Sequence, residues 1–148
     1  MSPMTEASTR DTTPVLLYDG ECGLCARSVQ FVLARESATQ RAALRFAPLQ
    51  GAFGATVRAR HPEIATTDSV VWYEPPAVNA SRVRIRSEAA LAMLVHVGGA
   101  WNALAVLGRL VPRPLRDAVY DVIARRRFAL VAAACLVPSS NERDRFLP

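Results

Sequence analysis

Two cysteines, Cys22 and Cys25, stand at C-x-x-C spacing directly after a short apolar run, residues 15–18. The run is typical of a buried strand, and the apolar residues that follow recur at helical spacing, so both thiols are predicted in the first turn of a helix. Backbone N–H groups there have no intrahelical acceptor and favour a nearby negative charge. We therefore expect a nucleophilic thiolate at Cys22, with Cys25 on the same helical face to resolve a mixed disulfide.

An acidic residue, Asp19, lies between the predicted strand and the cysteines. Its carboxylate can accept the N–H of Glu21 or Cys22 as a cap that fixes the turn, or it can move the proton of Cys25 during catalysis. The sequence leaves both roles open. Two opposing effects on the pKa of Cys22 are also expected. The carboxylates of Asp19 and Glu21 raise this pKa, whereas the helix terminus lowers it.

The same cysteines allow a second kind of site, which holds a soft metal ion such as Cu(I) or Zn(II) without catalysis. A closed zinc site needs four ligands, and the other candidates, His61, His96 and Cys135, are isolated in the sequence. We therefore favour the redox reaction, which requires no bound cofactor. It requires a disulfide-containing protein or a small thiol as substrate, and an external thiol reductant. Cys135 is interpreted as a buried, inert thiol, with a third redox cysteine as the alternative.

The frame Tyr-Asp-Gly-x-Cys-x-Leu-Cys at residues 18–25 resembles the DCC family of thiol-disulfide oxidoreductases, which is named for its Asp-Cys-Cys set. Residues 87–91 and 114–128 also resemble later segments of that family, so the likeness extends over nearly the whole chain after Pro14. The resemblance implies a thioredoxin-like fold and thiol-disulfide oxidoreductase activity. In such an activity Cys22, Cys25 and Asp19 are the catalytic residues.

The elements around the cysteines are typical of one α/β domain. Strands are predicted at residues 15–18, 44–49, 69–73 and 82–86, and helices at residues 22–37, 52–60 and 88–97. We expect the first two strands to pair in parallel, the last two to form an antiparallel hairpin, and Ser87 to cap the third helix. This β-α-β-α-β-β-α order is that of the thioredoxin-like mixed sheet. Such a sheet places the cysteines at the carboxyl end of its first strand.

The two ends of the chain complete the predicted organisation. Residues 1–13 are polar and without periodicity, which predicts a disordered leader, and residues 14–148 are predicted to form one domain. From about residue 100 the domain is expected to continue as a helical extension, at residues 101–110 and 114–134. Residues 1–13 also lack the apolar core of a secretory signal, so we expect a cytoplasmic location. In that compartment a C-x-x-C pair is more often catalytic or metal-binding than a structural disulfide.

The composition is that of a folded domain, because 51% of the 148 residues are apolar and 21% are charged. All eighteen basic residues are arginine, and eleven of them lie in residues 75–148 beside five acidic residues. A basic half can bind an anionic partner, but these arginines are scattered, so we expect a solvated face and no nucleic-acid partner. Residues 89–108 carry no charge, yet His96, Gly98 and Asn102 lie near their centre. We therefore expect two packed helices there and no association with a membrane.

Overall fold

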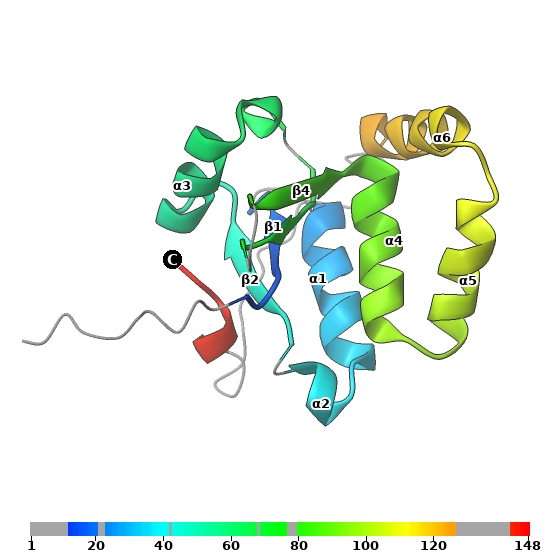
Figure 1. Cartoon of the computed structure of the whole chain (residues 1–148), viewed down its shortest axis with the longest axis horizontal. Helices are drawn as coiled ribbons and strands as arrows, with labels where there is room; N and C mark the ends of the chain where they lie inside the picture. The colour runs from blue at the N-terminus through cyan, green and yellow to red at the C-terminus, as the bar shows by residue number, and fades with distance from the viewer. Residues whose placement is uncertain (1–11, 21–22, 42, 68, 77–79, 127–142) are drawn as a thin grey trace, which may run out of the picture.

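The protein is built around a four-stranded mixed sheet with strand order β2-β1-β3-β4 (Figure 1). A computed structural model describes residues 12–20, 23–41, 43–67, 69–76, 80–126 and 143–148. The strands are β1 (Val15–Tyr18), β2 (Arg45–Pro48), β3 (Val71–Glu74) and β4 (Arg82–Ile85). β2 runs parallel to β1, whereas β3 runs antiparallel to β1 and to β4.

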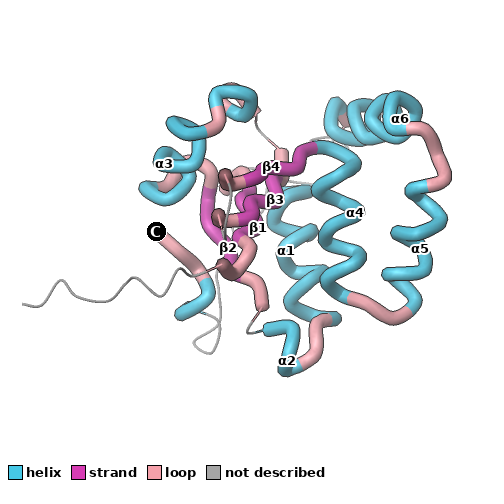
Figure 2. Tube along the Cα trace, viewed as in Figure 1, coloured by secondary structure: helices cyan, strands magenta, loops and turns pink. Residues whose placement is uncertain are grey.

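Helices cover both faces of this sheet. They are α1 (Gly23–Arg35), α2 (Ala38–Arg41), α3 (Ala52–Arg60), α4 (Arg86–Val97), α5 (Ala100–Arg109) and α6 (Arg113–Arg125), with 3-10 turns η1 (Pro62–Ile64) and η2 (Arg143–Arg145). Figure 2 shows α1 and α4 on one side of the strands and α3 on the other. The helices α5 and α6 lie beyond α4, farther from the sheet.

The core consists of two apolar layers, because successive side chains of a strand point to opposite faces. Leu16 and Tyr18 of β1 belong to the layer beneath α1 and α4, which also contains Phe46. Val15 and Leu17 belong to the layer beneath α3 and η1. β1 is buried on both faces, which explains why its four residues are all apolar or aromatic.

The observed order confirms the predicted β-α-β-α-β-β-α arrangement of a thioredoxin-like α/β fold. The parallel pair β1–β2 and the antiparallel hairpin β3–β4 are both as expected. The break between α4 and α5 also lies where the sequence predicts it, since Gly98 and Gly99 have φ of +75° and +60°. Only glycine adopts such values at no steric cost. No helix within the described residues is long and apolar enough to cross a membrane.

One expectation about the helices is wrong, and part of another lies outside the described residues. Ser87 does not cap α4, because this helix begins at Arg86 and its N-cap, Ile85, makes no side-chain hydrogen bond. The Ser87 hydroxyl instead donates to the Asp117 carboxylate of α6. The predicted helix over residues 114–134 corresponds to α6 as far as Arg125, and residues 127–142 lie outside the part that the structure describes.

The last residues of the chain close the edge of the sheet at β2. The Leu147 N–H donates to the Phe46 carbonyl at 2.7 Å, and the Phe146 ring stacks on the Phe46 ring with centroids 5.1 Å apart. The Pro148 carbonyl accepts the Phe53 N–H of α3 at 2.9 Å. An edge strand left open presents unpaired backbone groups to other chains. This C-terminal segment therefore covers part of that edge and links it to α3.

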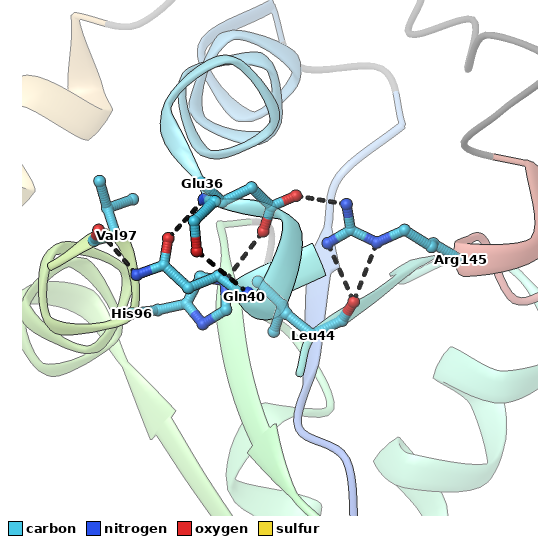
Figure 3. A network of polar contacts seen from close by, with 7 residues as sticks. Glu36, Gln40, Leu44, His96, Val97 and Arg145 are labelled. Atoms are coloured by element: carbon cyan, nitrogen blue, oxygen red, sulfur yellow. Dashed lines mark hydrogen bonds and ion pairs between the residues drawn. The ribbon is translucent and has the colours of Figure 1, made fainter. Parts of the chain in front are cut away.

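A buried ion cluster holds this segment in place (Figure 3). The Glu36 side chain, at the end of α1, has no exposed surface and lies 2.9 Å from His96 Nε2. Its other oxygen accepts a hydrogen bond from Arg145 Nη1. Arg145 Nε and Nη2 also donate to the Leu44 carbonyl at 3.2 and 3.0 Å. The cluster thus connects α1, α4, the start of β2 and the C-terminal segment.

The pKa of the Glu36 carboxyl is set by two opposing effects. Burial raises it, but hydrogen bonds from His96 and Arg145 and the charge of Arg145 outweigh burial, so the pKa lies below its ordinary value of 4.5. A carboxyl whose pKa is lower in the folded state stabilises the fold while it is ionised. This contribution is complete above pH 4.5 and is lost as the pH falls through the folded-state pKa.

Replacing Glu36 tests this cluster. Glu36→Gln is expected to lower the free energy of unfolding at neutral pH by about 3 kcal/mol, because Arg145 is then buried without its carboxylate. The difference from the parent should shrink as the pH falls below 4.5 and through the lower folded-state pKa, at which the parent carboxyl also becomes neutral. Urea unfolding at a series of pH values measures both effects. The exposed Glu63, which pairs with His61, supplies the control Glu63→Gln, for which little change is expected.

Candidate functional site

The structure describes two of the three residues that the sequence predicts as catalytic. Asp19 directly follows β1, and Cys25 lies in the first turn of α1, which begins at Gly23. Cys22, the predicted nucleophile, lies outside the described residues together with Glu21. The structure therefore describes the strand end and the helix start on either side of Cys22.

Asp19 is tied by Gln50 to the turn that follows β2. The Gln50 amide nitrogen donates to Asp19 Oδ1 at 2.7 Å, and its amide oxygen accepts the Gly20 N–H at 3.1 Å. The Asp19 residue is 9% exposed, so this hydrogen bond compensates part of the cost of burying a carboxylate. One side chain thus fixes both the acid and the first residue of the turn.

Backbone pairing places Gln50 next to the turn. β1 and β2 are parallel with Tyr18 opposite Pro48, so their carboxyl ends meet at one edge of the sheet. The Leu49 N–H donates to the Tyr18 carbonyl at 2.8 Å, which continues the pairing past the end of β2. The next residue, Gln50, then lies beside Asp19.

Cys25 is part of the hydrophobic core. The residue is 4% exposed and belongs to the apolar layer with Leu16, Tyr18 and Val29. A thiol in this position is shielded from large molecules in solution. Cys25 therefore faces inward from the first turn of α1.

The remaining candidate residues lie elsewhere. His61 contacts Ser81 and Glu63 at 2.7 and 3.0 Å, and His96 contacts Glu36 in the ion cluster. Cys135 lies outside the described residues. Among the residues that the structure describes, no three His, Cys, Asp or Glu side chains are grouped so as to hold a metal ion. The soft-metal alternative involves Cys22 and stays a prediction.

Sequence reasoning missed Gln50. A signal was present, because the carboxyl ends of parallel strands share an edge and Gln50 comes two residues after β2. Its amide nitrogen can donate to the Asp19 carboxylate while its amide oxygen accepts the Gly20 N–H. A search of the residues that follow the second strand for a polar partner of Asp19 would have found it.

The sheet order and the cysteine in the first helical turn after β1 define a thioredoxin-like α/β protein. Residues 16–133 match the family model of DCC1-like thiol-disulfide oxidoreductases. The chain therefore belongs to this family, as the DCC frame around Asp19 and Cys25 predicts.

Two relatives extend the comparison. The chain is 35% identical over 138 residues to the uncharacterized protein YuxK of Bacillus subtilis (strain 168), an alignment that covers 90% of this chain and 93% of YuxK. It is 29% identical over 120 residues to a chloroplastic DCC family protein of Arabidopsis thaliana. That alignment covers 81% of this chain and 66% of the plant protein. No solved structure matches the chain.

The contacts of Gln50 lead to a stability prediction. Gln50→Ala is expected to lower the free energy of unfolding by about 1–3 kcal/mol, because the buried Asp19 carboxylate loses a donor. It should also speed amide exchange at Gly20, whose N–H loses its acceptor. Chemical unfolding and hydrogen exchange measure the two effects. Gln30→Ala, at an exposed position of α1, is the matched control and should leave both quantities unchanged.

Proposed function

We propose that the protein is a thiol-disulfide oxidoreductase in which Cys22 attacks a substrate disulfide and Cys25 resolves the product. The observation that carries this proposal is the match to the DCC1-like oxidoreductase family over residues 16–133. The position of Cys25 supports it, because Cys25 lies in the first turn of α1, where the helix dipole favours a negative charge such as a thiolate.

In the proposed reaction the protein supplies two electrons to a disulfide. The Cys22 thiolate attacks one sulfur of the substrate, forms a mixed disulfide and releases the other substrate sulfur as a thiolate, which takes up a proton. Cys25, as a thiolate, then attacks the Cys22 sulfur and releases the second substrate thiol. The protein is left with a Cys22–Cys25 disulfide, and an external dithiol returns it to the reduced form.

The burial of Cys25 supports this division of roles. A residue that is 4% exposed is shielded from a protein disulfide in solution, whereas a mixed disulfide at Cys22, three residues earlier in the chain, is proposed to come within its reach. Shielding also protects the resolving thiol from side reactions while the mixed disulfide exists. Cys22 is therefore assigned the first attack.

Asp19 is proposed to accept the Cys25 proton in the second step. A thiol must lose its proton before it attacks, and a carboxylate placed in the same turn can take it. The bond from Gln50 supports this role because it fixes the Asp19 side chain at the carboxyl end of β1. We further propose that the reaction runs in the cytoplasm on a protein or small-molecule disulfide. Cellular thiol systems there can supply the electrons.

Single cysteine variants separate the two thiols. Cys22→Ser is expected to reduce disulfide reduction to the uncatalysed rate, because no first attack occurs. Cys25→Ser should also stop turnover but should accumulate a mixed disulfide between Cys22 and the substrate. An insulin-reduction assay and mass spectrometry under non-reducing conditions measure these outcomes. Cys135→Ser is the control with parental activity, and a fully active Cys22→Ser variant would refute the proposal.

Replacing Asp19 tests the proton transfer. Asp19→Asn keeps an oxygen that can accept the Gln50 amide but cannot take a proton, so the second step should slow by about 100-fold or more. The first step should change much less. Rapid-mixing measurements of mixed-disulfide formation and decay resolve the two steps. Asp144→Asn, at an exposed residue of η2, is the matched control. Equal slowing of both steps would show that Asp19 acts only on the structure of the turn.

A further inference from the structure

An apolar surface lies on the two helices that are farthest from the sheet. Of the ten large hydrophobic side chains that are exposed within the described residues, nine lie between residues 104 and 123. Leu107 is 60% exposed and Leu110, in the turn between α5 and α6, is 78% exposed. We call these nine side chains the α5–α6 face; they include Leu104, Leu107, Leu110, Leu115, Val119 and Val122.

The orientation of α6 creates this face. Some of its polar side chains point toward α4, where Arg116 pairs with Glu88 at 2.9 Å and Asp117 accepts a hydrogen bond from Ser87. The apolar stripe of α6, which includes Leu115 and Val119, is consequently exposed. In a helix that only covers a domain, the apolar stripe faces the core and the charges face water. In α6 two charged side chains face the domain while Leu115 and Val119 stay exposed, so these apolar side chains are available to another apolar environment.

A groove between α4, α5 and α6 extends the face inward. It encloses about 510 Å³, and its walls include Leu91 and Leu94 of α4, Leu104 and Leu107 of α5, and Ile123 of α6. A volume of this size accommodates hydrocarbon chains. Figure 1 shows α5 and α6 together at the side of the molecule opposite α3, with α4 between them and the sheet.

The charges around the face are positive. Arg109 and Arg113 flank the exposed turn at Leu110, and the exposed Arg125 and Arg126 lie at the end of α6. The acidic side chains of α6 are engaged by neighbours, since Asp117 binds Ser87 and lies 3.6 Å from Arg113. The second acid, Asp121, lies 3.6 Å from Arg86 of α4. An apolar centre with a positive rim attracts an anionic partner.

We propose that the α5–α6 face binds peripherally to a bilayer surface that contains anionic lipids. Amphipathic helices bind membranes in this way, with apolar side chains at the boundary of headgroups and acyl chains and arginines among anionic headgroups. The same charges disfavour a second copy of the chain, because a symmetric contact would bring arginine rims together. The helices lie on the membrane and do not span it, in agreement with their length.

Vesicle sedimentation of the full chain tests the proposal. The protein is expected to bind vesicles of phosphatidylcholine and phosphatidylglycerol in equal parts, and to bind phosphatidylcholine vesicles much more weakly. Leu110→Gln with Val119→Gln should weaken binding by about tenfold or more, because two exposed side chains no longer enter the bilayer. Arg109→Gln with Arg125→Gln should weaken it by about fivefold for each arginine and reduce its sensitivity to salt. Val95→Gln, the exposed apolar position on α4 outside the face, is the control that binds like the parent.

Three results would overturn the proposal. They are equal binding to both kinds of vesicle, equal binding of the Leu110/Val119 variant and the parent, and no binding at all. Analytical ultracentrifugation adds a fourth. A parent that is dimeric, and becomes monomeric in the Leu110/Val119 variant, would show that the face joins two copies of the chain. All the substituted positions are exposed, so each variant is expected to keep the fold. Circular dichroism of each variant checks this.

Discussion

The parallel pairing of β1 with β2 decides where the candidate site lies. This pairing continues beyond the strand ends through the bond from the Leu49 N–H to the Tyr18 carbonyl. As a result Gln50 stands beside Asp19 and fixes the turn that leads to α1. The position of Cys25 then follows, because α1 must begin within a few residues of Asp19 and pack its first turn on β1. A shift of one residue in the register would turn every side chain of β1 to the other face.

The same strand pair is held at its opposite end by the Glu36 cluster. Arg145 binds the Leu44 carbonyl just before β2 begins, and Glu36 joins it to the end of α1. Side chains from outside the unit formed by β1, α1 and β2 therefore bind it at both ends. The uncharged amide of Gln50 does so at one end, and Arg145 of the buried ion cluster does so at the other. Asp19 and Glu36, which stand before and after the segment that carries Cys25, are thus each bound by a side chain from farther along the chain.

Much of the fold follows from local patterns in the sequence. The apolar run of β1, the glycine pair at Gly98 and the hairpin of β3 and β4 each depend on neighbouring residues, and each is where the sequence predicts it. Contacts between distant residues were not predictable in this way. The bond from Gln50 to Asp19 spans 31 positions and the pairing of Arg145 with Glu36 spans 109. The Ser87 cap failed for the same reason, since a helix far along the chain offered its hydroxyl a carboxylate.

The antiparallel register gives α6 a particular place relative to the turn after β1. Leu17 pairs with Val71 and Val71 with Ile85, so β4 ends, and α4 begins, at the same edge of the sheet where β1 ends. The helix α6 is attached to this first turn of α4 through Ser87 and Glu88. A membrane surface that bound α6 would therefore also keep the turn after β1 close to the membrane. Disulfides anchored there would meet the protein by diffusion in two dimensions, at an effective concentration far above that of the same groups in solution.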